Sequence, residues 1–269
     1  MSRNLGINLG CFSDPSLAAK DQVRLMKENG FSATFCGSER ALTMEAFPYL
    51  QEAGIVFDNL HAPFDKINDI WSAGPEGDVM LDRLIRSVDT CVRVGAKALV
   101  VHLSAGDKAP HVNDYGVDRF AKLMEKAKAE NILICYENQR KLSNLAMAFE
   151  EFPAEARFCW DCGHESCFTP GRHYMPLFMH KLSALHIHDN RGIYNADNHM
   201  IPGDADMDFD YVAEQIALSG YQGTLMLELI RNKTDYYADW TPEQYYAHAA
   251  ESARNLRAKI EAYEAKLNA

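Results

Sequence analysis

The chain alternates between strand-like and helix-like segments eight times, and this alternation limits the folds open to it. Glycines close several helix-like segments, as at Gly30, Gly54 and Gly95, where they are typical of helix C-caps. Eight strand–helix units in about 260 residues match a closed (β/α)8 barrel in number and length. The strand-like segments are Leu5 to Cys11, Phe31 to Cys36, Ile55 to His61, Ala98 to His102, Asn131 to Glu137, Phe158 to Asp161, Leu182 to His186 and Thr224 to Leu229.

A doubly wound open sheet is the alternative arrangement of such units. Its nucleotide-binding versions have a glycine-rich turn after the first strand, whereas here Gly10 is followed by Cys-Phe-Ser-Asp-Pro15. No linker, low-complexity tract or charge block divides the chain. We therefore expect an α/β protein with one (β/α)8 TIM-barrel domain over residues 1–269.

The composition favours a protein of the cytoplasm. Hydrophobic residues make up 47% of the chain, which is ample for a core. No apolar run approaches the roughly 20 residues that a membrane helix needs, and Met1 to Asn4 lead directly into a strand-like segment. We expect a soluble cytoplasmic protein without a membrane partner.

The seven cysteines are an odd number, and most lie inside apolar strand-like segments. This placement is typical of reduced core thiols and not of a disulfide framework. Cys159 and Cys162 form a CxxC pair, but no second pair exists to complete a zinc ribbon. On a strand the two side chains would also point to opposite faces. The sequence therefore disfavours a redox or zinc-ribbon role.

Histidine or acidic residues stand where six consecutive strands end. In a (β/α)8 barrel these ends form the active-site face. A polar residue hydrogen-bonded at a strand edge explains any one of them. Six in one register indicate a shared site instead, and the residue types are those that hold Zn2+ or Mn2+. The residues are His61, His102, Glu137, Asp161 with His164, His186 and Glu228.

Several longer motifs surround these strand ends, and through them the chain resembles the xylose isomerase-like barrel superfamily. That superfamily includes sugar epimerases and isomerases and endonuclease IV, and the similarity covers essentially the whole chain. The motifs are His61-Ala-Pro-Phe64, the strand that ends at Glu137, Asp161-Cys-Gly-His164, His186-Ile-His-Asp189, Pro202-Gly203-Asp204 followed by Asp208-Phe209, and Glu228.

The resemblance implies a divalent cation, Mn2+, Mg2+, Co2+ or Zn2+, held by Glu137, Asp161, His186 and Glu228. In the epimerases two glutamates at the metal exchange a proton next to a carbonyl, and they match Glu137 and Glu228. Such a proton becomes acidic only if the enediolate is stabilised, which a divalent cation does as a Lewis acid. The resemblance thus implies a sugar or sugar phosphate isomerase or epimerase.

His186 and His188 point to the same face of their strand, so each is a candidate ligand. The family pattern places the ligand three residues before an acid, which favours His186 ahead of Asp189. His188 then contacts the substrate or donates a hydrogen bond to a ligand.

The expected substrate is a small sugar. His164 matches a position that reaches the substrate in the epimerases, and Arg191 stands near their substrate-binding arginine. His61, His102 and His188 complete the expected substrate-binding set. The second substrate-binding glutamate of the epimerases has no counterpart, because the segment reads Arg140-Lys-Leu-Ser.

The alternative is a phosphodiesterase like endonuclease IV, whose three-metal site would add ligands at His61, His102 and His164 and an additional metal pair at Asp197 and His199. The loops Asp65 to Asp78, Ala105 to Asn113 and Asn190 to Met207 carry few basic residues, and we expect no basic cluster over the site. A net charge of −11 also disfavours nucleic acid as a partner.

A third reading is a non-catalytic sugar-binding relative. Loss of activity usually removes a ligand, and none is missing here. The last helix presents a face of tyrosine and alanine, which is typical of packing on the barrel. Such faces also serve in homo-oligomers.

Overall fold

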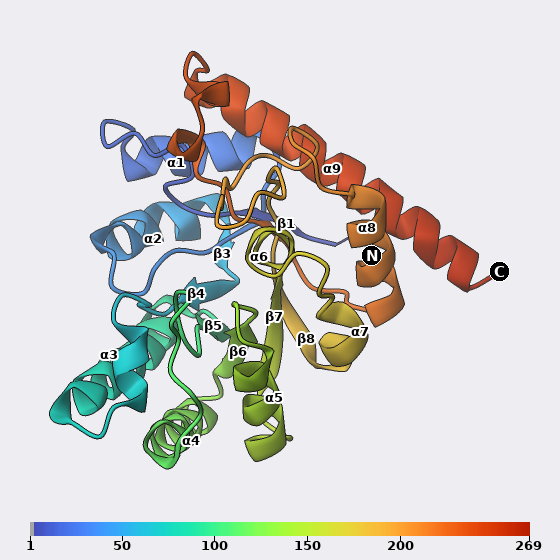
Figure 1. Cartoon of the computed structure of the whole chain (residues 1–269). Helices are drawn as coiled ribbons and strands as arrows, with labels where there is room; N and C mark the ends of the chain where they lie inside the picture. Colours follow the sequence, from blue (N-terminus) through green and yellow to red (C-terminus); the bar gives the residue numbers. More distant parts are fainter. Residues whose placement is uncertain (1–2) are drawn as a thin grey trace.

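The computed structural model describes residues 3–269 (Figure 1). The strands are short and lie inside a ring of helices. They are β1 (Leu5–Ile7), β2 (Ala33–Thr34), β3 (Val56–Phe57), β4 (Asn59–His61), β5 (Ala98–Val101), β6 (Leu133–Glu137), β7 (Arg157–Asp161), β8 (Leu182–His186) and β9 (Leu225–Leu227). The α-helices are α1 (Ala19–Glu28), α2 (Ala41–Ala53), α3 (Pro75–Val94), α4 (Asp114–Ala129), α5 (Leu142–Glu151), α6 (Cys162–Phe168), α7 (Met175–Phe178), α8 (Phe209–Ser219) and α9 (Pro242–Leu267). Short 3-10 helices are η1 (Ile67–Trp71), η2 (Met179–Lys181), η3 (Arg231–Lys233) and η4 (Asp235–Tyr237).

The strands close into a barrel, as the sequence predicts. One set has the order β3-β2-β1-β9 and the other β4-β5-β6-β7-β8, with every pairing parallel. Parallel bridges from Gly37 to His61 and from Ile187 to Leu227 join the two sets. The third expected strand is divided at Asp58, so that β3 pairs with β2 and β4 pairs with β5.

Alternate residues along the strands face two different cores. In β5, Ala98 and Val100 belong to a small cluster inside the barrel, whereas Leu99 and Val101 join the large core under the helices. The inner cluster also contains Cys135, Cys159 and Ala184. Because side chains alternate along a strand, the residue two positions later points into the barrel as well. This period places the strand-end residues above the inner cluster. His102 stands two positions after Val100, Glu137 two after Cys135, Asp161 two after Cys159 and His186 two after Ala184.

Helix α6 corrects the expectation about the CxxC pair. Its N-cap is Asp161, whose Oδ1 accepts a hydrogen bond from the His164 amide at 2.6 Å. Cys162 is therefore the first residue of a helix and does not share a strand with Cys159. All seven cysteines are buried and unpaired, as expected for reduced core thiols. In Figure 1, α6 lies over the strand ends in the centre of the ring of helices.

No helix of residues 3–269 combines the length and the apolar character that crossing a membrane requires.

The last helix is long and begins with a capping box. Thr241 accepts a hydrogen bond from the Gln244 amide, and the Gln244 side chain accepts one from the Thr241 amide. Helix α9 then packs on α8 and buries Ala249, Ala253 and Ile260. The box fixes where this closing helix starts, because it satisfies amides that have no partner within the helix.

We predict that Thr241→Ala lowers the free energy of unfolding by about 1 kcal/mol, because one helical amide loses its acceptor. Thr241→Ser keeps the hydroxyl and serves as the matched control. Urea unfolding followed by circular dichroism gives both values. Equal stability of the two variants would show that the box contributes nothing.

Candidate metal centre

Four of the strand-end side chains meet above the inner cluster of the barrel. Glu137, Asp161, His186 and Glu228 each place one ligand atom within 4.8 Å of the others. His186 Nδ1 lies 3.2 Å from a Glu228 oxygen and 3.6 Å from a Glu137 oxygen. Metal–ligand bonds of about 2.0–2.2 Å would bring all four atoms to one ion after small movements.

The same four groups carry buried atoms without a hydrogen-bond partner among the described residues. These atoms are Glu137 Oε1, Asp161 Oδ2, His186 Nδ1 and Glu228 Oε2. Each side chain is at most 15% exposed. Buried polar atoms are costly when unsatisfied, and three carboxylates around one imidazole leave an excess of negative charge. The donor set therefore fits a divalent cation.

Two further histidines hold the outer oxygen of Glu137. His102 Nε2 lies 2.9 Å and His61 Nε2 3.2 Å from Glu137 Oε2. Both partners of His61, the Ala62 carbonyl at Nδ1 and the Glu137 carboxylate at Nε2, are acceptors, so the ring donates to both only when it carries two protons. These contacts turn Glu137 Oε1 toward Asp161 and His186.

The carboxylates and imidazoles shift one another's protonation. Burial alone would raise the pKa of Glu137, but the charges of His102, His164 and His186 hold it well below its usual range. Burial likewise opposes a charge on His164, yet Asp161 and Glu137 raise its pKa to about 10. The carboxylates thus draw positive charge into the centre.

His188 has its own place beside Asp161. Its Nε2 lies 3.1 Å from Asp161 Oδ1, and its side chain is fully buried. A β-carbon added to Gly163 would lie only 2.0 Å from the His188 ring, so glycine is needed there for the ring to reach Asp161. Of the two roles weighed for His188, this geometry fits the hydrogen bond to a ligand. In the sequence, Gly163 is visible as part of Asp161-Cys-Gly-His164, but the space that it leaves for the His188 ring is not.

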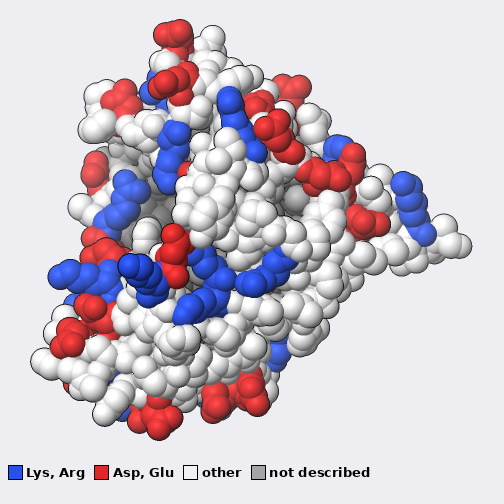
Figure 2. All heavy atoms as spheres, in the orientation of Figure 1, with Lys and Arg blue, Asp and Glu red and all other residues white. Residues whose placement is uncertain are grey.

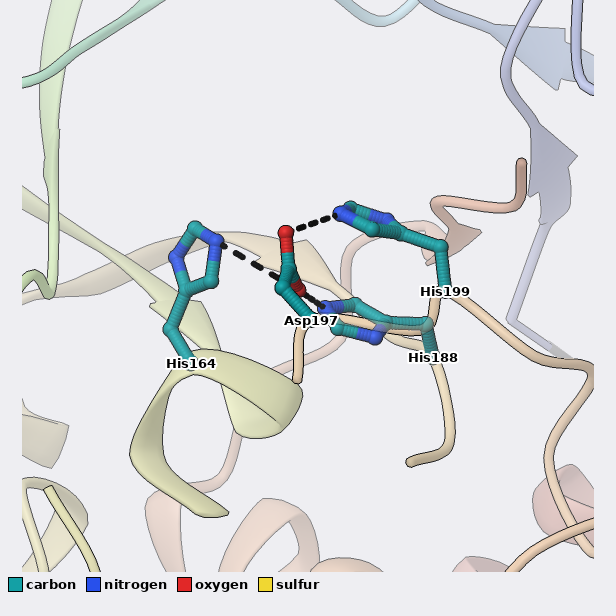
Figure 3. Close-up of side chains that lie close together, drawn as sticks. All are labelled: His164, His188, Asp197 and His199. Carbon is teal, nitrogen blue, oxygen red and sulfur yellow. Dashed lines mark hydrogen bonds and ion pairs between the residues drawn. The ribbon is translucent and has the colours of Figure 1, made fainter. Parts of the chain in front are cut away.

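A second cluster adjoins the first and combines His164, His188, Asp197 and His199 (Figure 3). Asp197 lies between the rings, with Oδ2 2.8 Å from His199 Nε2, and Oδ1 3.8 Å from His188 Nε2 and 4.0 Å from His164 Nε2. His199 donates its Nδ1 hydrogen to the carbonyl of Glu228, and its Nε2 forms a 2.8 Å contact with Asp197 Oδ2. The other oxygen of this carboxylate, Oδ1, has no hydrogen-bond partner among residues 3–269.

The loop that supplies Asp197 and His199 is anchored by Asp189. Its carboxylate accepts hydrogen bonds from the amides of Gly203, Ala205 and Met207 at 2.9–3.1 Å. His199 is held at φ 48°, a left-handed conformation that few non-glycine residues adopt. The buried anchor stabilises a strained segment at the site, which is typical of functional loops. The sequence showed Asp189 only as part of a motif.

A cavity of about 1050 Å3 opens over both clusters. It reaches Glu137, His164, Asp197 and Glu228 at its base. His61, His102 and Phe64 also line it, as expected for substrate contacts. His188 and Arg191 are not among its lining residues, and Arg191 is exposed. Their substrate-binding roles therefore stay predictions without geometric support.

A family model for the xylose isomerase-like TIM barrel matches residues 37–256. The chain belongs to this family.

Solved structures of the same fold include sugar epimerases. A D-tagatose 3-epimerase-like protein is 18% identical, with a TM-score of 0.73, over 99% of this chain and 100% of that one. The 3-keto-D-glucoside 4-epimerase YcjR from E. coli is 17% identical, with a TM-score of 0.72, over 95% and 100%. A curated relative, the uncharacterized protein y4fM of Sinorhizobium fredii, is 30% identical over 142 residues. That match covers 50% of this chain and 42% of y4fM, so the chain matches less than half the length of that relative.

This xylose isomerase-like barrel also carries a basic cluster that the sequence analysis did not expect. Arg140, Lys141 and Arg172 line a smaller hollow beside the main cavity. These three residues come from the segments after β6 and α6. They lie outside the loops Asp65 to Asp78, Ala105 to Asn113 and Asn190 to Met207. The expectation of no basic cluster over the site is therefore wrong.

We predict that Asp161→Asn and Glu228→Gln each weaken binding of a divalent cation by more than tenfold, because each loses a charged ligand. Replacing a residue that merely supports a ligand already costs about 10–100-fold. Equilibrium dialysis with Mn2+, read by elemental analysis, measures the change.

The matched control is Glu165→Gln. Glu165 is a buried carboxylate on helix α6, the helix that Asp161 caps. It accepts hydrogen bonds from Trp160 and Tyr174 and belongs to neither cluster. Unchanged Mn2+ occupancy in Asp161→Asn and Glu228→Gln would show that these residues are not ligands.

Proposed function

We propose that the protein is a metal-dependent isomerase or epimerase of a sugar or sugar phosphate. The observation that carries this proposal is the meeting of four buried ligand atoms, from Glu137, Asp161, His186 and Glu228, beneath a large cavity that Glu137 and Glu228 line. The likeness in fold to sugar epimerases supports the same class of reaction.

The bound cation would supply Lewis acidity that stabilises negative charge on oxygen next to the reacting carbon. Glu137 and Glu228 are the candidate acid and base. They stand at the ends of different strands, line the same cavity and lie 3.6 Å and 3.2 Å from His186 Nδ1. Burial opposes ionisation of Glu228, but the charges of His186 and His199 lower its pKa. Both carboxylates are thus ionised at neutral pH, so one can accept the substrate proton, and the other, after taking a proton from solvent, can donate it to the carbon.

The remaining walls suit a small polyhydroxy compound. His61, His102 and His164 line the cavity, and Phe64 is 52% exposed beside them. Phe64 stacks on His102 with ring centres 4.8 Å apart. Few polar groups that fix orientation and an apolar wall are typical of small-molecule sites.

We predict that turnover of an active ketose in D2O places deuterium on the carbon next to the carbonyl. Glu137→Gln and Glu228→Gln should lower kcat by at least about 100-fold, since a positioned acid or base contributes roughly 10²–10⁴-fold. NMR of the recovered sugar reads the exchange. Glu165→Gln, outside the cavity, serves as the control and should retain kcat. Full kcat in both glutamate variants would contradict the assignment.

We further propose that Asp197 and His199 hold an additional divalent cation together with His164 and His188. Lys233 Nζ lies 3.3 Å from Asp197 Oδ2 and contributes one positive charge there. The side chain of Asp197 is only 16% exposed, and its Oδ1 has no hydrogen-bond partner among residues 3–269. The unused Asp197 Oδ1, 3.8 Å from His188 Nε2 and 4.0 Å from His164 Nε2, is the oxygen available to a cation.

We predict that Asp197→Asn removes one equivalent of bound Zn2+ while the equivalent at Glu137 and Asp161 remains, because the two clusters have separate carboxylates. Calorimetric titration measures the stoichiometry. A single equivalent in the unaltered protein would contradict the additional site. Incision of an abasic-site duplex that Asp197→Asn abolishes, without turnover of any ketose, would favour the phosphodiesterase alternative.

A further inference from the structure

A second hollow of about 270 Å3 lies beside the main cavity and is lined by Arg140, Lys141, Arg172 and Asp107. Arg140 and Phe168 line both spaces, so the two adjoin. Since a water molecule takes about 30 Å3 in the liquid, the hollow has room for a small anion and its hydration. Figure 2 shows Lys and Arg side chains gathered in a band on this face of the molecule.

Two of the three cations in this hollow have no carboxylate partner among residues 3–269. The Lys141 ammonium donates to the backbone carbonyls of Ala109 and Pro110. Arg172 donates to the carbonyl of Arg140 at 3.1 Å and to the Tyr174 hydroxyl at 3.5 Å. Neutral acceptors orient both side chains but leave their charges uncompensated. An anion in the hollow would find them already positioned.

Arg140 is the third cation and is the most firmly held. Its Nε lies 2.8 Å from Asp107 Oδ1, and its Nη2 donates to Asn195 at 2.6 Å. The guanidinium stacks on Phe168, with Cζ 3.7 Å from the ring centre. Phe168 stacks in turn on His164 at 4.5 Å. Two stacked side chains, Arg140 and Phe168, thus lie between the hollow and His164 of the candidate metal centre.

The charges in the hollow suit a dianion. Arg140, Lys141 and Arg172 face one acid, Asp107, which leaves an excess of two positive charges. This excess stands in a chain whose net charge is −11. A phosphate monoester carries about −1.5 to −2 at pH 7, whereas a carboxylate or one phosphodiester carries a single negative charge. The local charge therefore matches a phosphate monoester best.

We propose that this hollow binds the phosphate group of a phosphorylated sugar whose reacting carbons lie at the metal centre. The inference rests on the proposed function and names its substrate class. The phosphate sits at the end of the sugar remote from the reacting carbonyl. Lys141 and Arg172 give it charge-assisted hydrogen bonds, and Arg140 forms the wall between the phosphate and His164.

The test is calorimetric binding to the metal-loaded full chain. The probes are D-fructose, D-fructose 6-phosphate and D-fructuronate, which differ in the group at the far end of the ketose. The variants are Lys141→Gln and Arg172→Gln, each removing one uncompensated cation. Arg93→Gln and Lys20→Gln are the matched controls. Arg93 on α3 and Lys20 on α1 are exposed, and each substitution changes the net charge by the same amount as Lys141→Gln or Arg172→Gln.

We expect D-fructose 6-phosphate to bind at least tenfold more tightly than D-fructose. Lys141→Gln and Arg172→Gln should each weaken the phosphate ester by about tenfold or more and leave D-fructose unchanged. Arg93→Gln and Lys20→Gln should change neither. Because two separate substitutions are used, a folding defect in one leaves the other to decide.

Equal affinity for the ester and the free sugar would overturn the proposal, as would an equal loss in the control variants. Tighter binding of D-fructuronate than of the phosphate ester would overturn the choice of phosphate. The proposed isomerase or epimerase activity is tested separately, by turnover of neutral ketoses. Such turnover without any preference for the ester would overturn the phosphate site and leave the isomerase standing.

Discussion

The concentration of carboxylates at the carboxyl ends of the barrel strands is the constraint on which the rest of the structure depends. Glu137, Asp161 and Glu228 bring three carboxylates around His186 in a buried site. Without a cation the surrounding imidazoles carry the compensating protons, as the raised pKa of His164 and the lowered pKa of Glu137 indicate. A divalent cation satisfies the same atoms without protons, and it makes metal binding dependent on pH.

The barrel makes this arrangement possible because its strands all run in one direction. Small inner residues such as Cys135, Cys159 and Ala184 fill the layer below the site. The next inward position on each strand then reaches the mouth of the barrel, where ligands from separate strands converge. The large cavity above them is lined by loops that can vary without disturbing the strands. A basic hollow on one side of it can therefore select a substrate, while the metal centre stays the same.

Much of the barrel could be predicted from periodicity and turn residues. Helix α8 begins after a capping aspartate, Asp208, and ends before Gly220, and both signals stand in the sequence. The meeting of Glu137, Asp161, His186 and Glu228 followed from their shared register at strand ends. Helix α6 was not predicted, because a segment of seven residues is too short to show a helical period. Its sequence resembles the end of a strand instead.

Other parts of the site depend on contacts that no local pattern encodes. Arg140 and Arg172 are far apart in sequence and meet only because two segments lie side by side. The roles of Gly163 against His188 and of Asp189 under the Gly203 loop likewise require the folded chain. Arg191 shows the converse, since its position in the sequence suggested the substrate site, but its side chain is exposed and does not line the cavity.

The central claim is that the strand-end cluster holds a divalent cation. The most direct measurement is anomalous scattering at the manganese edge from crystals grown with Mn2+. The account predicts a peak within bonding distance of Glu137, Asp161, His186 and Glu228. Refined carboxylates in direct contact with His186, with no anomalous peak between them at saturating Mn2+, would contradict it.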